Sequence, residues 1–195
     1  MPYSPLPEGH VAAIATSLEM TEKPKLRPTP ASDLQLVRWT APALNTYRSL
    51  FRRVGEPWLW CSRLLLSDDE LAAIIHDPDV RIWAVSDRRG IEVGILELDF
   101  RETGQCEIAF FGLIPDLNGK GHGRWLMAMA LQLGWAREGV KRMWVHTCTL
   151  DGPGALAFYQ KCGFVAYQRQ LETFPDPRLT GLSPRDTAPQ IPIIE

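Results

Sequence analysis

The chain has 195 residues, of which 45% are hydrophobic and 23% are charged, and its formal net charge is −2. This composition is that of a folded domain with enough apolar material for a core, so a disordered chain is excluded. The charge gives no basic excess for nucleic acid, and no apolar run reaches the roughly 18–20 residues that cross a bilayer.

The four cysteines are widely spaced and form no CxxC pair: Cys61, Cys106, Cys148 and Cys162. This spacing argues against a zinc site, and the size of the chain argues against a disulfide framework. The N-terminus lacks the basic start and the long apolar run of a signal peptide. We therefore expect reduced thiols in a cytoplasmic protein that holds no metal.

Proline is concentrated near both ends of the chain, where it blocks regular structure. Residues 1–33 are predicted to form an N-terminal arm, in which His10 to Met20 can add an edge strand. Residues 174–195 are predicted to form an irregular C-terminal tail. The region between them, 34–173, is the predicted main domain.

The main domain begins with a predicted strand over residues 34–39 and two predicted helices. Thr40 can cap the first helix, and Pro42 suits its first turn. Apolar residues of this helix recur at i, i+3, i+4 and i+7: Tyr47, Leu50, Phe51 and Val54. Ser67 and Glu70 form a capping-box pair that opens the second helix.

Three strands of a meander are predicted next, over residues 81–86, 96–101 and 106–113. Apolar and polar residues alternate in the second strand, which predicts one face in water: Leu96, Leu98 and Phe100 against Glu97, Asp99 and Arg101. The third strand is almost wholly apolar after its first residues, so we expect it at the centre of the sheet.

A glycine-rich loop and a helix over residues 124–138 follow the third strand. This helix is apolar on every side and is expected to be buried all round. A strand over residues 143–147, a helix over 153–162 and a strand over 164–170 complete the domain. Together the elements predict a mixed α/β fold.

The loop between the third strand and the buried helix is the segment best suited to bind an anion. Gly119, Gly121 and Gly123 are three glycines within five residues, and they let a ligand approach the main-chain amides. Unpaired amides at a helix start attract a negative group, and a diphosphate is the natural occupant. Lys120 and Arg124 can add positive charge at its rim.

Glycines before a helix also occur in plain turns and in two further phosphate-binding motifs. The spacing of the glycines excludes the two motifs. A plain turn between strand and helix would also use glycine, and a GxGxG sequence alone does not exclude it. A Walker loop needs GxxxxGK followed by Ser or Thr, which this chain lacks. A dinucleotide fingerprint needs GxGxxG within a parallel βαβ unit, whereas here an antiparallel meander precedes the loop.

Two motifs in this order resemble the GNAT superfamily of acyl-CoA N-acyltransferases. The first is Gln or Arg, two residues, Gly, one residue, and Gly or Ala, and it matches Asn118, Gly121 and Gly123, with Asn118 in place of Gln or Arg. The second is FYQKCGF, from Phe158 to Phe164. The resemblance covers residues 34–170 and implies a mostly antiparallel sheet flanked by helices, so that 34–173 would be an N-acetyltransferase domain.

The resemblance implies that acetyl-CoA is the cosubstrate and that the loop binds it. The residues implied in this binding are Asn118, Gly119, Lys120, Gly121, His122, Gly123 and Arg124. Main-chain amides around Leu113 and Ile114 are expected to polarise the thioester carbonyl. A separation between the third strand and the strand at 143–147 would admit the pantetheine arm.

Two residues are the candidates for proton transfer. An amine with a pKa of ~10.4 is mostly protonated at neutral pH, and the Glu107 carboxylate, which opens the third strand, could remove that proton. The alternative for Glu107 is a carboxylate that faces solvent at a strand end. The resemblance makes Tyr159 the acid that protonates the departing thiolate. The alternative for Tyr159 is a core tyrosine that packs beside Phe158 and Phe164.

Further reactive or aromatic residues admit two interpretations. His146 and Cys148 share a face of one strand, but no third group is predicted to orient a base there, so core packing is expected. Trp58 and Trp60, together with the arginines at positions 52 and 53, would wall the acceptor pocket if the resemblance holds. Alternatively, the tryptophans belong to the core and the arginines to a solvated face.

The resulting hypothesis is an N-acetyltransferase that moves an acetyl group to a primary amine by direct attack in a ternary complex. The alternative is a non-catalytic acyl-CoA-binding sensor or partner module. The expected partners are acetyl-CoA and an amine acceptor, without nucleic acid, membrane or metal. The sequence identifies neither the acceptor nor the oligomeric state.

Overall fold

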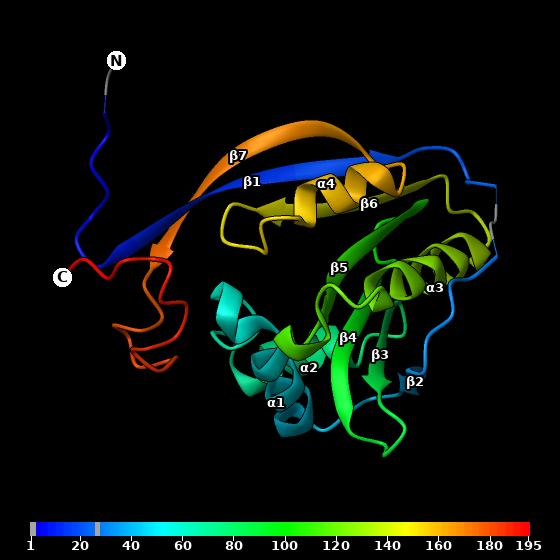
Figure 1. Cartoon of the computed structure of the whole chain (residues 1–195), viewed down its shortest axis with the longest axis horizontal. Helices are drawn as coiled ribbons and strands as arrows, with labels where there is room; N and C mark the ends of the chain where they lie inside the picture. Colours follow the sequence, from blue (N-terminus) through cyan, green and yellow to red (C-terminus); the bar gives the residue numbers. More distant parts are fainter. Residues whose placement is uncertain (1–2, 26–27) are drawn as a thin grey trace.

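The computed structural model describes residues 3–25 and 28–195, and these form one sheet with helices on both faces (Figure 1). The strands are β1 His10–Met20, β2 Gln35–Trp39, β3 Val80–Ser86, β4 Glu92–Asp99, β5 Gln105–Leu113, β6 Arg142–Cys148 and β7 Val165–Pro175. The helices are α1 Leu44–Gly55, α2 Asp68–Ile75, α3 His122–Ala136 and α4 Ala155–Lys161, with 3₁₀ turns η1 Glu56–Trp58 and η2 Pro115–Leu117.

Within the described residues the strand order is β2-β3-β4-β5-β6-β1-β7. Every neighbouring pair is antiparallel except β5 and β6, which run parallel. The predicted mixed α/β fold with a mostly antiparallel sheet is confirmed. The apolar third strand of the meander is β5, and it lies in the middle of the order, as its composition predicts.

The strand at His10–Met20 forms, but it is not an edge strand. It pairs with β6 on one side and with β7 on the other, and so it lies inside the sheet. The edges are β2 and β7. The prediction of an edge position was wrong because a strand's neighbours depend on residues far along the chain. The proposed division into arm, domain and tail stays a prediction, and residues 1–2 and 26–27 of that arm lie outside the described residues.

A local signal accounts for the start of α2 but not for that of α1. Ser67 and Glu70 form the predicted capping box of α2: the Glu70 amide donates to Ser67 Oγ and the Ser67 amide to Glu70 Oε2 at 2.9 Å. Helix α1 begins at Leu44, later than Thr40 and Pro42 predict. The reason is Ala41, whose φ of 44° is left-handed and cannot continue a helix.

Helices cover both faces of the sheet, and side chains alternate between the two faces along β3 and β4. Leu96 packs in the core beneath α3 and α4, whereas Ile82 and Ile95 pack in the core beneath α1 and α2. Helix α3 buries one side through Trp125 and Leu126. Met127, Ala130 and Trp135 are buried as well, but Met129, Leu131 and Leu133 on the other side are half-buried, so the expectation of a helix buried all round was wrong. No helix among the described residues is long and apolar enough to cross a bilayer.

The polar side of β4 is buried, contrary to the predicted face in water. Glu97 is 0% exposed and Asp99 is 8% exposed. The Tyr47 hydroxyl donates to Glu97 at 2.6 Å, and Arg63 pairs with the other carboxylate oxygen at 2.6 Å. Burial raises the pKa of Tyr47 well above its usual value, and the charge of Glu97 adds to this rise. The network fixes α1 and the loop after η1 to the central sheet.

The C-terminal segment after β7 contains no helix or strand among the described residues, and it is held by buried polar contacts. Arg178 is 3% exposed and pairs with Asp176 at 2.7 Å. The same guanidinium donates to the carbonyls of Thr187, Ala188 and Ile191. These bonds close the segment into a compact cap at the end of the molecule where both termini lie (Figure 1).

We predict that Glu97→Gln destabilises the fold by about 3–5 kcal/mol, because it leaves the Arg63 charge buried without a partner. The free energy of unfolding should be measured by urea denaturation. The control is Glu102→Gln, an exposed carboxylate, which should change stability by less than about 0.5 kcal/mol. A loss for Glu97→Gln as small as that of the control would contradict a stabilising network.

Candidate functional site

The two parallel strands at the middle of the sheet separate after a short pairing. Strand β5 pairs with β6 at three positions, the last being Glu107 opposite Trp144. The register of β5 against β4 shifts at Ala109, where one extra residue bulges, and a bulge bends and twists a strand. A cavity of about 540 Å³ lies where the strands have separated. The predicted separation of these strands is therefore present.

The glycine loop opens on this cavity with a row of unpaired amides. Asn118, Gly119 and Gly123 line the cavity. Within the described part of the chain, the amides of residues 119–123 donate to no partner, whereas those of Asn118 and Arg124 bond to loop carbonyls. Gly119 and Gly121 have φ of 74° and 89°, a conformation that favours glycine. The row runs into the first turn of the 15-residue helix α3, which begins at His122, so helix dipole and amides together favour an anion.

The side chains of the loop point to different places. Lys120 and Arg124 are exposed, and neither lines the cavity. The His122 ring faces the segment before β2, where Nδ1 lies 2.9 Å from Ser32 Oγ and Nε2 lies 3.8 Å from Asp33. Only the main chain of His122 is therefore available to an anion at the loop.

Of the two main-chain amides predicted to polarise a carbonyl at the end of β5, one is free to face the cavity. The Ile114 amide donates to the Val93 carbonyl at 2.9 Å, so the prediction that it polarises a carbonyl was wrong. Bonded and non-bonded pairs alternate in an antiparallel ladder. Since Ile114 is bonded to β4, the amide of Leu113 must turn away from β4, toward the separated side. Leu113 lines the cavity, and its role stays a prediction.

Glu107 and His146 form a pair at the point where the strands part. His146 Nδ1 lies 3.6 Å from Glu107 Oε1, and the His146 side chain is 51% exposed. His146 lines the cavity, whereas Glu107 lies behind it, beside Trp144. The expectation that His146 packs in the core was wrong. Glu107 does not stand at a free sheet edge either, since β6 covers it.

The charges around His146 favour its protonated form. The pairing with Glu107 raises the pKa of His146 above its ordinary value of 6.5, against an opposing effect of burial. The charges of Asp151 and Glu172 also raise this pKa. The third group that the sequence left unidentified is thus Glu107, which orients the imidazole from the neighbouring strand.

Tyr159 lies in α4, on the opposite side of the cavity from the loop after η1. Its side chain is 7% exposed and lines the cavity. The ring packs against Phe158 and Phe164, with centroids 5.6 and 6.3 Å away. Burial raises the pKa of Tyr159, so its phenol stays protonated at neutral pH. The two interpretations from the sequence are therefore compatible: the ring packs in the core while the residue borders the cavity.

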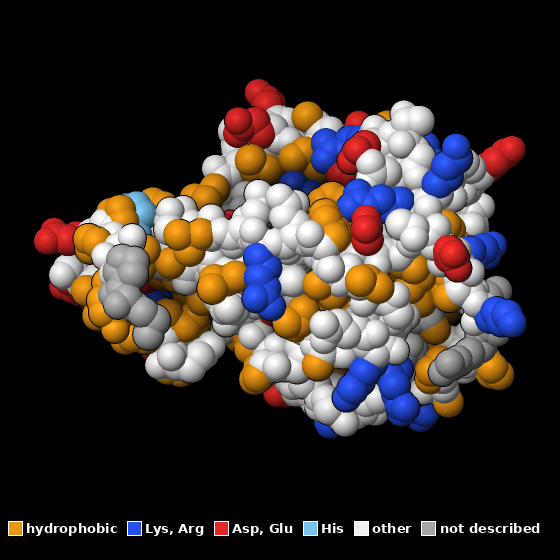
Figure 2. Space-filling view, turned by 90° about the horizontal axis from the view of Figure 1, so that it is seen from above, with side chains coloured by type: hydrophobic (Ala, Val, Ile, Leu, Met, Phe, Trp, Pro, Cys, Tyr) orange, Lys and Arg blue, Asp and Glu red, His pale blue; other side chains and the backbone are white. Residues whose placement is uncertain are grey.

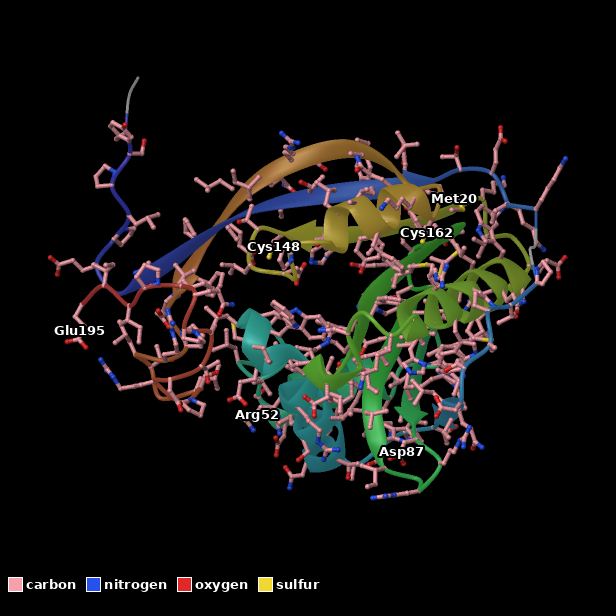
Figure 3. The ribbon with its side chains drawn as sticks, viewed as in Figure 1. Met20, Arg52, Asp87, Cys148, Cys162 and Glu195 are labelled. Atoms are coloured by element: carbon pink, nitrogen blue, oxygen red, sulfur yellow. The ribbon has the colours of Figure 1, made fainter. Side chains whose placement is uncertain are left out.

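The remaining wall is aromatic and acidic. Trp58 and Trp60 line the cavity, whereas Arg52 lies on the outer side of α1 (Figure 3) and Arg53 donates to the Glu92 carbonyl. The predicted tryptophan wall is thus present, and the arginines belong to the solvated face. Within the described chain no lysine or arginine lines the cavity.

Two carboxylates that line the cavity were not predicted from the sequence. Asp151 accepts from Trp60 Nε1 at 3.2 Å, from Thr147 Oγ1 at 2.7 Å and from the Cys148 amide at 2.9 Å. Glu172 reaches the cavity from β7. A short loop after β6 and an exposed edge strand gave no pattern that distinguishes these residues. The four cysteines are unpaired.

Comparisons with known proteins identify relatives of this chain. The family model described as "Acetyltransferase (GNAT) family" matches residues 41–164. Spermidine N(1)-acetyltransferase of Vibrio cholerae is 27% identical over 123 residues, which cover 59% of this chain and 69% of that protein.

Solved structures share the fold at low sequence identity. A conserved protein of unknown function from Staphylococcus epidermidis superposes with a TM-score of 0.58 at 13% identity. The match covers 86% of this chain and 63% of that chain, so this chain spans less than two thirds of that protein. An aminoglycoside acetyltransferase from an uncultured soil sample superposes with a TM-score of 0.54 at 16% identity, over 67% of this chain and 88% of that chain.

We predict that the His146 imidazole titrates above pH 6.5 and that Glu107→Gln lowers its pKa. The charged pair therefore stabilises the fold fully below pH 6.5, and this contribution is lost as the pH rises through the higher pKa of the folded state. A proton NMR titration of the ring measures both values. A wild-type pKa at or below 6.5, or one that Glu107→Gln leaves unchanged, would show that the two side chains do not interact.

Proposed function

Because this chain belongs to the acetyltransferase (GNAT) family, we propose that it moves an acetyl group from acetyl-CoA to a primary amine by direct attack in a ternary complex. Members of the family use acetyl-CoA as cosubstrate. The observation that carries the proposal is the row of unpaired amides at residues 119–123, beside a cavity that runs between two separated strands.

The residues present fit the coenzyme. A Cβ placed on Gly119 would meet nothing within 4 Å, so the loop leaves space for a diphosphate against the amides. The separated strands β5 and β6 leave main-chain groups unpaired, and these suit the amides of a pantetheine arm. The amide of Leu113 would then face the thioester carbonyl and stabilise the negative charge that develops there.

The proposed reaction assigns each proton to a residue at the cavity. The amine nitrogen attacks the thioester carbonyl carbon, so that a C–N bond forms and the C–S bond breaks. The neutral form of His146 takes the proton of the ammonium ion, which frees the nitrogen lone pair for the attack, and Glu107 orients and stabilises the resulting imidazolium. The second proton of the nitrogen passes to solvent as the intermediate breaks down. Tyr159 gives its proton to the thiolate that leaves, and solvent restores both residues.

We predict that Gly121→Ala weakens acetyl-CoA binding by about tenfold or more. A side chain at φ 89° costs about 1–3 kcal/mol, which the free loop relieves by changing conformation and which binding must then restore. Isothermal titration calorimetry measures the Kd. The matched control is Gly90→Ala, with a φ of 81° in the turn between β3 and β4, which should keep wild-type affinity. Saturable binding must be seen in the wild type; its absence at millimolar acetyl-CoA would refute the proposed function.

Replacing Tyr159 by Phe is expected to lower turnover by about 10²–10⁴-fold while the Kd for acetyl-CoA stays the same. The hydroxyl is lost but the packing of the ring is kept. Thiol release with a panel of amines measures turnover. Tyr167→Phe, on the exposed strand β7, is the control. Full activity of Tyr159→Phe would remove the acid role, and thiol release by no amine would favour a binding module without catalysis.

A further inference from the structure

We propose that the acceptor is a monoamine with an apolar, preferably aromatic, body and no acid group, and that Glu172 draws its ammonium group into the cavity. The proposal rests on the proposed function and names the substrate class for the same site. It follows from two properties of the acceptor side of the cavity: the sign of its charges and the chemistry of its walls.

Apart from one histidine, the charged side chains that line the cavity are negative. Among the described residues that line it, the charged side chains are Asp151, Glu172 and His146. On the outer surface, Figure 2 shows Lys and Arg side chains mainly over the broad end of the molecule, interspersed with Asp and Glu, and hydrophobic side chains over the narrow end. A cation is therefore attracted to this cavity, and a second acid group on the acceptor would be repelled.

Of the carboxylates near the cavity, Glu172 is the one left available. Asp151 already accepts three hydrogen bonds, and Glu107 is paired with His146. Glu172 enters no side-chain hydrogen bond or ion pair within residues 3–25 and 28–195, and in the sheet it lies opposite Ala13 on β1. Burial raises the pKa of Cys61 and of Cys148, two thiols on different walls, and the charge of Glu172 adds to both rises. Glu172 therefore acts across the cavity from the β7 side.

The walls around this carboxylate are aromatic. Trp60 is fixed between its hydrogen bond to Asp151 and the ring of Phe110, with centroids 5.3 Å apart. Gly112 lies beside it, and a Cβ there would come within 2.6 Å of Val54 Cγ1 and 3.1 Å of the Trp60 ring. Trp58 and Phe174 complete the lining on this side. Such surfaces bury an apolar or aromatic group, and their faces also attract an ammonium ion.

These properties distinguish between classes of amine. An amino acid or an acidic peptide would bring a carboxylate toward Glu172. A polyamine would bring several ammonium groups to a cavity with one available carboxylate. An aminoglycoside would bring many hydroxyls to aromatic walls that offer few hydrogen-bond partners, and unpaired polar groups are costly to bury.

The test is thiol release from acetyl-CoA with four acceptors: phenethylamine, phenylalaninamide, phenylalanine and spermidine. The amide and the free acid have nearly the same shape and differ by one negative charge. Because the amine of the amide is also the weaker base, kcat/KM is compared at equal concentrations of unprotonated amine. We expect kcat/KM to be at least about tenfold higher for phenylalaninamide than for phenylalanine, and at least about tenfold higher for phenethylamine than for spermidine. Equal or reversed preference in either pair would overturn the proposal.

Two variants test the residues themselves. Glu172→Gln should raise the KM of phenethylamine by about threefold or more and narrow the gap between amide and acid, because the repelling charge is gone. Trp58→Ala should raise the same KM by loss of apolar contact. The controls are Glu22→Gln, an exposed carboxylate outside the cavity, and Trp39→Ala on edge strand β2. Wild-type KM values in both Glu172→Gln and Trp58→Ala would overturn the assignment.

The outcome also separates this proposal from the proposed function. Acetyl-CoA binding with thiol release by spermidine or phenylalanine alone would leave the transferase and refute the acceptor class. Acetyl-CoA binding without thiol release by any amine would refute both. The Kd for acetyl-CoA must stay at its wild-type value in Glu172→Gln, since that residue lies away from the glycine loop.

Discussion

The separation of β5 from β6 is the constraint on which the site depends. Parallel pairing holds for three positions and ends at Glu107. Beyond that point the bulge at Ala109 turns β5 away, and the main-chain groups of both strands face a cavity inside the sheet. The glycine loop follows the end of β5 and α4 follows β6, so the glycine loop and Tyr159 reach the same cavity. If β5 and β6 paired along their whole length, there would be no cavity between them for these two groups to line.

Much of the fold can be predicted because many of its elements are determined by short segments. The capping box at Ser67 and the left-handed turn at Gly121 need only a few neighbouring residues. The failures concern contacts between distant segments. The alternation in β4 shows which residues share a face, but it does not show that Tyr47 and Arg63 will cover Glu97. The inner position of β1 depends likewise on partners in β6 and β7.

The same distinction holds for the candidate site. The motifs around Gly121 and Tyr159 are local, and the sequence places both at the cavity. The pairing of Glu107 with His146 joins β5 to β6, two strands that α3 separates in the chain, and no local sequence pattern predicts it. Asp151 and Glu172 are single acids in otherwise unremarkable segments, so only the folded structure identifies them. His122 is the opposite case, since it lies in the motif but its ring faces Ser32.

The inner position of β1 also affects the order in which the chain can fold. Strand β1 is synthesised more than a hundred residues before β6 and β7, so it has neither neighbour until they have been made. Non-local pairing of this kind slows folding and exposes unpaired strand edges meanwhile. The half of the sheet that holds β2 to β5 has sequence-adjacent partners and can assemble earlier. Synthesis thus completes one wall of the cavity before the other exists.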